Sequence, residues 1–206
     1  MTPQSPSAWA SFALAASLCL MTAMSSPPAA AAQDEFVIKT IADKKIKALP
    51  PGPLYWRVEN FSTLAQAGAA ATATSLSAEV AGKVWLFTLG AAGASTPGGT
   101  KVAEVGPVPP LVAPEYLLRI TYSGGPPGAK TAVHSHPGAE AFYVLTGRMG
   151  QKTPNGMTYT DAGKTLNGQG ADMAMEVTSA GTTDLNQLVM FVIDATRPFA
   201  SEAHFH

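Results

Sequence analysis

Apolar and polar residues alternate along several short segments in the second half of the chain, and glycine, proline, asparagine or aspartate separates these segments. This alternation is typical of strands that bury one face. The segments that predict strands are residues 115–125, 130–136, 140–147, 148–153, 156–162 and 186–195. Short strands at near-regular spacing are typical of a β-sandwich or barrel, so the pattern predicts an all-β fold.

The first half of the chain has fewer regular patterns. Residues 36–49 are compatible with a short strand and with a helical turn, and the pattern does not choose between them. Residues 64–70 predict one short helix, with Asn60 or Ser62 as its N-cap. Residues 83–90 are apolar and rich in β-formers, which predicts an added strand.

The chain begins with a segment that fits an export signal. An apolar run over residues 9–24 is followed by alanines that end at Ala32, as at a signal peptidase site. An uncleaved membrane anchor is the alternative, but a run of about 16 residues is short for a bilayer span. We therefore expect cleavage after Ala32 and an exported protein, periplasmic or secreted.

The composition excludes several kinds of chemistry. The single cysteine, Cys19, lies in the apolar run, so a chain cleaved after Ala32 has no thiol for catalysis, disulfides or metal binding. The formal net charge is −1, and no basic stripe suited to nucleic acid is present in the sequence. We expect no nucleic-acid partner and no stable membrane insertion of the mature chain, while a homodimer stays open.

The clearest chemical signal lies at residues 134–140. His134 and His136 are two residues apart in a predicted strand, so their side chains point to the same face. Pro137 and Gly138 predict a tight turn, after which an antiparallel return would bring Glu140 beside the histidines. Two imidazoles and one carboxylate on one face can hold a divalent metal with open positions.

A solvated hairpin that merely carries these three side chains is the alternative. The apolar residues Phe142 and Val144 share the face of Glu140 by alternation. An unpaired carboxylate among apolar groups is costly, and a bound metal removes that cost. The sequence context therefore favours the metal site.

The same segment resembles the first motif of the cupin superfamily, G-x5-H-x-H-x3,4-E-x6-G. Gly128, His134, His136, Glu140 and Gly147 fit every spacing of that motif. The resemblance implies a cupin-like double-stranded β-helix (jelly-roll) barrel. It also implies that His134, His136 and Glu140 point inward as ligands of a divalent metal, which could be Fe, Mn, Ni or Zn.

The resemblance covers about residues 116–198 and gives the expected organisation of the chain. We expect a signal peptide, an N-terminal extension with a short helix and an added strand, the cupin barrel, and a disordered tail. Their boundaries are 1–32, 33–110, 111–199 and 200–206.

The chain departs from the family at the second cupin motif, usually G-x5-P-x-G-x2-H-x3-N. Counting back from the apolar residues 188–193 places Met175 where the histidine is expected, with Met173 as the alternative, and Ser179 at the asparagine. A thioether is a poor ligand for hard divalent metals, so the four-ligand site of the family is incomplete here.

Other polar and aromatic residues have simpler explanations. His204 and His206 repeat the H-x-H spacing at the chain end, where a frayed terminus is expected, although the tail could also fold over to supply the fourth ligand. Arg119 and Arg148 could reach an anionic ligand at the barrel mouth, but exposed strand arginines are commoner. Tyr143, Trp56 and Trp85 are expected to pack in the core.

Three functions are compatible with these features. The first is an exported cupin-like metalloprotein that binds a small organic molecule in its barrel and, if it is an enzyme, acts as a metal-dependent dioxygenase or isomerase. The second is a non-catalytic periplasmic module that binds a small ligand or metal, which Met175 favours. The third is a structural barrel with an empty site, and the intact set of His134, His136 and Glu140 counts against it. The fold alone does not choose among the three functions.

The export signal gives a direct prediction. Mature protein from a periplasmic extract should begin near Gln33, because the alanines before that residue fit the cleavage site. Intact mass measurement checks this start. A membrane-bound product that retains Met1 would contradict it.

Overall fold

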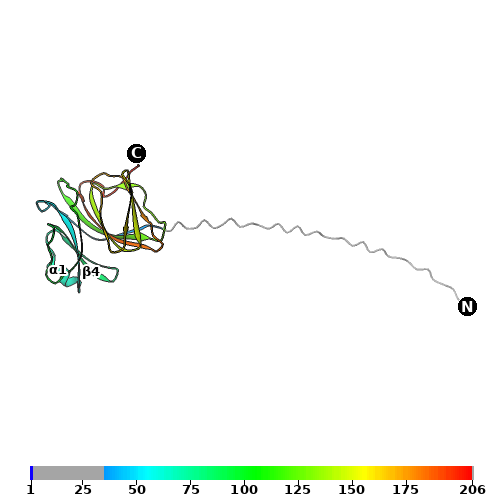
Figure 1. Cartoon of the computed structure of the whole chain (residues 1–206), viewed down its shortest axis with the longest axis horizontal. Helices are drawn as coiled ribbons and strands as arrows, with labels where there is room; N and C mark the ends of the chain where they lie inside the picture. The colour runs from blue at the N-terminus through cyan, green and yellow to red at the C-terminus, as the bar shows by residue number, and fades with distance from the viewer. Residues whose placement is uncertain (2–34, 206) are drawn as a thin grey trace. The chain divides into compact units, whose positions relative to one another are not determined.

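The computed structural model describes Met1 and residues 35–205 of the chain (Figure 1). The chain divides into two units, Met1–Ala32 and Gln33–His206, and all the helices and strands named here belong to the second. The expected signal peptide lies outside the described residues. Within residues 35–205, no helix has both the length and the apolar character that crossing a membrane requires.

Eight antiparallel strands form two sheets of a barrel. The first sheet has the order β6-β13-β8-β11, with β6 (Tyr116–Gly125), β13 (Leu185–Asp194), β8 (Gly138–Thr146) and β11 (Thr165–Asn167). The second consists of β7 (His134–Ser135), β12 (Glu176–Ser179), β9 (Arg148–Thr153) and β10 (Gly156–Asp161). Backbone bridges from Lys130 to Thr178 and from His134 to Met175 join the β7 segment to the segment of β12.

Apart from the β9–β10 hairpin, the chain alternates between these two sheets, which is the winding of a jelly roll. From β6 to β8 it passes through β7 in the second sheet, and β11, β12 and β13 alternate in the same way. The predicted double-stranded β-helix is therefore confirmed.

Two further strands extend the sheets. β1 (Val37–Ile46) pairs with β6 through nine residue pairs, with a register shift between Thr40 and Ala42, so the segment that could have been a helical turn is a strand. β14 (Ser201–Glu202) pairs with β7, with Ser201 opposite Ser135. The sequence predicted a disordered tail from residue 200, and that prediction is wrong for these residues because their backbone completes the edge of β7.

A third sheet forms from the N-terminal part of the chain, which is richer in strands than the sequence predicted. Its order is β3-β4-β2-β5, with β2 (Tyr55–Phe61), β3 (Ser75–Val80), β4 (Lys83–Gly90) and β5 (Thr100–Val105). The predicted strand is β4, and the predicted helix is α1 (Leu64–Ala70). The N-cap is Thr63 rather than Asn60 or Ser62, because the Thr63 hydroxyl accepts the Gln66 amide at 3.2 Å.

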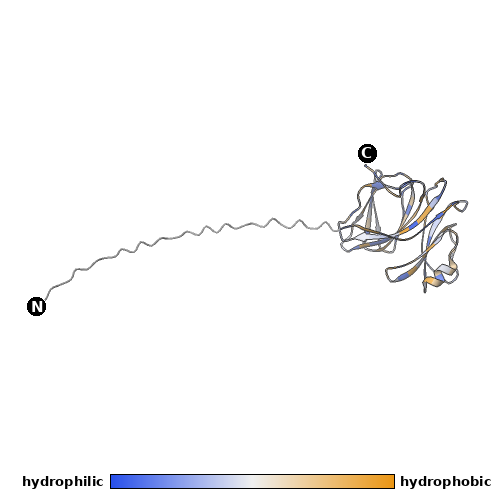
Figure 2. Ribbon diagram, turned by 180° about the vertical axis from the view of Figure 1, so that it is seen from behind, coloured by the Kyte–Doolittle hydropathy of each residue, from blue (hydrophilic) through white to orange (hydrophobic). Residues whose placement is uncertain are grey.

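The hydrophobic core has two main parts, which lie on opposite faces of the β6-β13-β8 sheet. Figure 2 shows both hydrophobic and hydrophilic residues along the strands. One part includes Trp56 and Trp85 and packs the third sheet against the outer face of the barrel. The other fills the barrel interior and includes Phe142, Val144 and Phe191. The wall that carries Glu140 is therefore buried on both sides, which holds its position firmly.

The connection between the histidines and Glu140 differs from the predicted hairpin. Gly138 is the first residue of β8 and lies opposite Ile193, and the Asp194 amide donates to the Pro137 carbonyl at 2.9 Å. A Cβ at Gly138 would collide with the backbone oxygen of Val192. Glycine is thus needed for close approach to β13 rather than for a tight turn, and the segment crosses from one sheet to the other.

Candidate functional site

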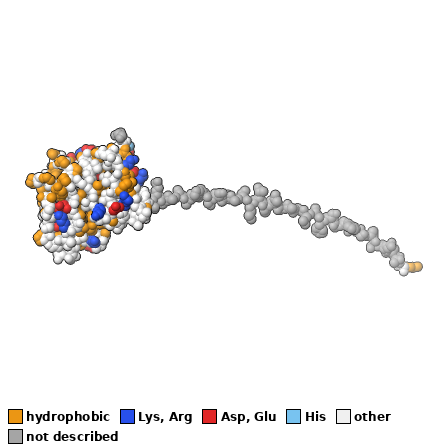
Figure 3. Space-filling model, in the orientation of Figure 1, with side chains coloured by type: hydrophobic (Ala, Val, Ile, Leu, Met, Phe, Trp, Pro, Cys, Tyr) orange, Lys and Arg blue, Asp and Glu red, His pale blue; other side chains and the backbone are white. Residues whose placement is uncertain are grey.

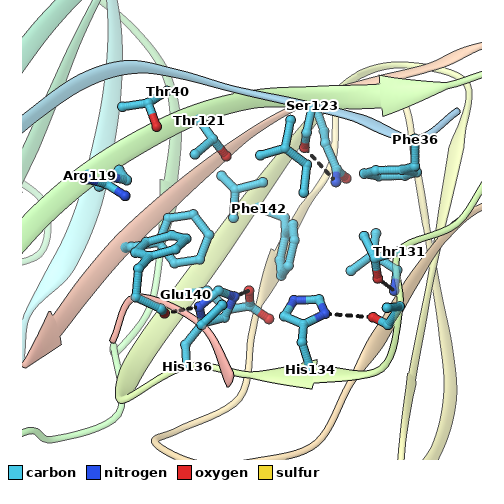
Figure 4. A pocket seen from close by; sticks show the side chains of 18 of the residues that line it. Phe36, Thr40, Arg119, Thr121, Ser123, Thr131, His134, His136, Glu140 and Phe142 are labelled. Atoms are coloured by element: carbon cyan, nitrogen blue, oxygen red, sulfur yellow. Dashed lines mark hydrogen bonds and ion pairs between the residues drawn. The ribbon is translucent and has the colours of Figure 1, made fainter. Parts of the chain in front are cut away.

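Glu140 occupies the interior of the barrel at the centre of the first sheet. It lies on β8 opposite Phe191 of β13, which in turn lies opposite Arg119 of β6. Phe142 follows two residues later on the same face, as alternation predicted. These residues line a cavity of about 720 Å³, and Figure 4 shows His134, His136 and Glu140 on one side of it.

The two histidines have the same hydrogen-bonding arrangement. His134 Nδ1 lies 2.8 Å from the Ala132 carbonyl oxygen, and His136 Nδ1 lies 2.7 Å from that of Phe199. Because a carbonyl oxygen only accepts, Nδ1 carries the ring proton, and Nε2 of each neutral ring keeps its lone pair. Metal-binding histidines typically have this arrangement, in which the second nitrogen donates to a backbone carbonyl.

Glu140 and His136 are both buried, with Nε2 of the histidine 3.9 Å from Oε2 of the carboxyl group. Burial raises the pKa of Glu140 to about 8, although the 2.8 Å hydrogen bond from Gln151 acts in the opposite direction. Burial lowers the pKa of His136 to about 4; the bond to Phe199 raises it and the nearby His134 lowers it further. Without a metal, the pair is therefore a neutral acid beside a neutral imidazole rather than a salt bridge at neutral pH.

Met175, the position at which the sequence spacing predicts the histidine of the second cupin motif, lies beside this group. Its backbone exchanges two hydrogen bonds with His134, of 2.8 and 2.9 Å. Its side chain is buried, and its sulfur lies 3.7 Å from Nε2 of Gln151, the same nitrogen that bonds Glu140. A side chain at position 175 is thus next to the carboxylate, but here it presents a thioether.

The C-terminal segment contributes a residue that the sequence did not reveal. The ring centroids of Phe199 and His136 are 4.9 Å apart, and the Arg119 guanidinium lies 4.5 Å from the centroid of Phe199. Arg197, just before Phe199, binds Asp172 with two hydrogen bonds of 2.6 and 3.1 Å. A contact through a backbone carbonyl does not depend on residue type, so no sequence motif encodes the bond between His136 and Phe199. The aromatic side chain of Phe199 was the one available sequence signal.

The other residues singled out in the sequence have different surroundings. His204 is exposed, 4.0 Å from a carboxylate oxygen of Glu202, and His206 lies outside the described residues. Arg119 lines the cavity but is paired with Asp43, whose Oδ2 lies 2.8 Å from one guanidinium nitrogen. Arg148 is exposed on β9. On the face shown in Figure 3, basic and acidic side chains lie in small mixed groups rather than in one stripe.

The donor atoms fit a divalent metal in kind. Two imidazole nitrogens with free lone pairs and one carboxylate oxygen suit iron, manganese, nickel or zinc. Among residues 35–205, however, no three His, Cys, Asp or Glu side chains are already gathered closely enough to hold an ion. The rings of His134 and His136 stand 5.0 Å apart between centroids. The three side chains together would have to shift to bring their donor atoms around one metal.

The strand order gives this molecule the fold of a double-stranded β-helix protein. No family model matches the chain. No curated protein matches it either.

Several solved structures are similar in fold. One is a double-stranded β-helix protein from Klebsiella pneumoniae subsp. pneumoniae, with 19% identity over 42% of this chain and 75% of that chain, and a TM-score of 0.37. A cupin-like protein from Thermotoga maritima is 17% identical over 43% of this chain and 65% of its own, with a TM-score of 0.38. A polyketide cyclase from Streptomyces resistomycificus is 20% identical over 43% and 62%, with a TM-score of 0.35. The chain spans less than two thirds of the last two proteins.

The buried acid gives a prediction for the pH dependence of stability in metal-free protein. Between pH 4.5 and about 8, the unfolded chain ionises at Glu140 while the folded protein keeps that proton, so stability falls as pH rises. His136 acts oppositely, adding stability as pH rises from about 4 to 6.5. Above pH 6.5 only the Glu140 effect remains, with a slope of up to about 1.4 kcal/mol per pH unit.

Urea unfolding in the presence of a chelator, repeated between pH 6.5 and 8, measures this slope. Glu140→Gln should remove it because the amide does not titrate, whereas the exposed Glu202→Gln should leave it intact. An equal slope in Glu140→Gln would show that another group causes it.

Proposed function

We propose that this protein binds a divalent metal ion through His134, His136 and Glu140, and a small organic molecule in the cavity beside it. The observation that carries the proposal is the pair of neighbouring imidazoles, each with Nδ1 held by a backbone carbonyl and Nε2 free, next to a buried carboxyl group. A metal would replace the proton that the buried carboxyl group otherwise keeps.

The chain's residues would supply orientation and a less polar environment. The Ala132 and Phe199 carbonyls fix the two rings, and the Gln151 amide fixes one oxygen of Glu140. Apolar side chains such as Phe142 line part of the cavity and would lower the polarity around a bound ligand. A bound metal would supply a Lewis acid or a redox centre with open positions for a ligand.

Catalysis of the dioxygenase or isomerase type is the enzymatic form of this proposal, with Glu140 able to hold or release a proton when it is not a full ligand. The other form is a non-catalytic module that captures a small ligand or metal. Met175 supports that form, because its sulfur lies against Gln151 and is a poor ligand for hard ions. In both forms we propose that the protein acts after export, in the periplasm or outside the cell.

Metal content of purified protein tests the proposal. Protein carrying no histidine tag should hold close to one divalent ion by mass spectrometry of the dissolved metal, and His134→Ala or Glu140→Ala should each reduce the occupancy. A chain that ends at Ala203 should keep its metal. A chain that ends at Arg197 loses the Phe199 carbonyl and should bind metal about tenfold or more weakly.

Thermal melting of the same variants separates loss of ligand from loss of fold. If the chain that ends at Ala203 loses as much metal as His134→Ala, the terminal histidines are ligands and the proposed site is wrong. The proposal would also be overturned if the wild-type protein remained metal-free after incubation with each candidate ion.

The substitution Met175→His tests the place of the missing fourth ligand. An imidazole beside Glu140 should tighten metal binding by tenfold or more, about 1.4 kcal/mol. Met175→Leu removes the thioether without adding a donor, so it should leave the affinity unchanged. Metal titration and thermal melting are measured on both variants.

The opposite outcome for Met175→His is equally clear. If the imidazole finds no metal, it is a buried unpaired polar ring that destabilises the fold by about 1–3 kcal/mol. Reduced stability with unchanged affinity would mean that position 175 does not face the metal, and Met173→His would be the next variant.

A further inference from the structure

Gln187 is a buried polar residue of the cavity that the proposed metal site does not use. It lies on β13, opposite Ser123 of β6 and Val144 of β8, and only 1% of its surface is exposed. Its Nε2 donates to the Ser123 hydroxyl at 3.3 Å. Its Oε1 has no hydrogen-bond partner within residues 35–205.

This unpaired oxygen points to a ligand. Five buried side-chain atoms lack a partner in the described part of the chain, and Gln187 is the only one of their residues that lines the cavity. Buried amide oxygens are nearly always hydrogen-bonded, because leaving one unpaired costs free energy. A donor that arrives from outside the chain would satisfy it.

The strand register places this oxygen far from the triad. Glu140 and Phe191 form one row across the sheet, Phe142 and Val189 form the next, and Gln187 belongs to the third. Since residues rise about 3.3 Å each along a strand, the first and third rows are about 13 Å apart. Figure 4 shows Phe142 between Glu140 and Ser123, so apolar surface separates the two polar ends.

We propose that Gln187 and Ser123 form a second recognition point, which accepts an uncharged hydroxyl or amide donor at the end of the cavity away from His134, His136 and Glu140. This inference rests on the proposed function only for the metal that would bind the opposite end of the ligand, near His134, His136 and Glu140. The separation of about 13 Å between the two ends and the apolar row of Phe142 and Val189 between them suit a ligand with one aromatic ring. The ligand class is a small aromatic acid with a hydroxyl group on the side of the ring opposite its acid group.

The two cationic side chains that line the cavity are both paired within the chain, Arg119 with Asp43 and Lys130 with Glu176. The proposed metal is therefore the group that would hold the ligand's acid group, at the triad end. The amide oxygen of Gln187 carries no charge and cannot donate, so it favours a neutral donor over a carboxylate.

Calorimetric titration with three probes tests the inference. The wild type should bind 4-hydroxybenzoate at least tenfold more tightly than benzoate, about 1.4 kcal/mol, and more tightly than 4-methoxybenzoate, which has no donor. In Gln187→Leu the ratio between 4-hydroxybenzoate and benzoate should fall to about one, with metal content unchanged. Ser179→Ala removes another unpaired buried atom outside the cavity, so it should keep the wild-type ratio.

Each result has a defined meaning. Equal affinities for the probes, no binding of any probe, or a ratio that survives in Gln187→Leu overturns the inference. If Gln187→Leu does not fold, Gln187→Met has nearly the same shape and replaces it, while the comparison with 4-methoxybenzoate needs only the wild type.

The same titrations in the presence of a chelator separate this inference from the proposed function. A tenfold ratio in protein that never binds metal supports the Gln187 subsite and contradicts the metal site. Full metal occupancy together with equal affinities for 4-hydroxybenzoate and benzoate supports the metal site and contradicts the Gln187 subsite.

Discussion

A carboxyl group buried in an apolar barrel is the feature on which the rest of the site depends. Glu140 is 2% exposed and receives one hydrogen bond, from Gln151, so its charge cannot be stabilised by water. Such a group must keep its proton or acquire a positive partner. His134 and His136 lie on the same side of the cavity as Glu140, and their Nε2 atoms together with the carboxylate could bind a metal as that positive partner.

The surrounding structure holds these groups in place from three directions. The third sheet covers the outer face of the strand that carries Glu140, the β13 backbone fits closely against Gly138, and the C-terminal segment supplies the carbonyl that orients His136. The tail is thus a working part of the site, and its contribution comes from the backbone of Phe199 rather than from the histidines of the chain end. Opposite the triad, Gln187 gives the cavity a second polar end.

The barrel and the candidate metal ligands could be predicted from the sequence because both depend on local spacing. Alternation gave the short strands, and two histidines two residues apart necessarily share a face. Of the third sheet the sequence predicted β4 alone. Apolar and polar residues alternate over residues 56–59 of β2, but the polar ones are buried as well, with Arg57 paired to Glu59. The predicted hairpin was wrong because proline and glycine signal a turn locally, whereas Gly138 is required by contact with β13, distant in sequence. The role of Phe199 and the unpaired oxygen of Gln187 depend on tertiary contacts that no local pattern encodes.

Crystals of the mature protein grown with manganese or zinc, with diffraction data collected at the absorption edge of that metal, give the most direct test of the central claim. Our account predicts one anomalous peak in the barrel, within about 2.0–2.3 Å of Nε2 of His134 and His136 and of a Glu140 oxygen. The peak should disappear in His134→Ala. A peak at the chain end, or an empty barrel at full metal excess with Glu140 still bonded only to Gln151, would contradict the account.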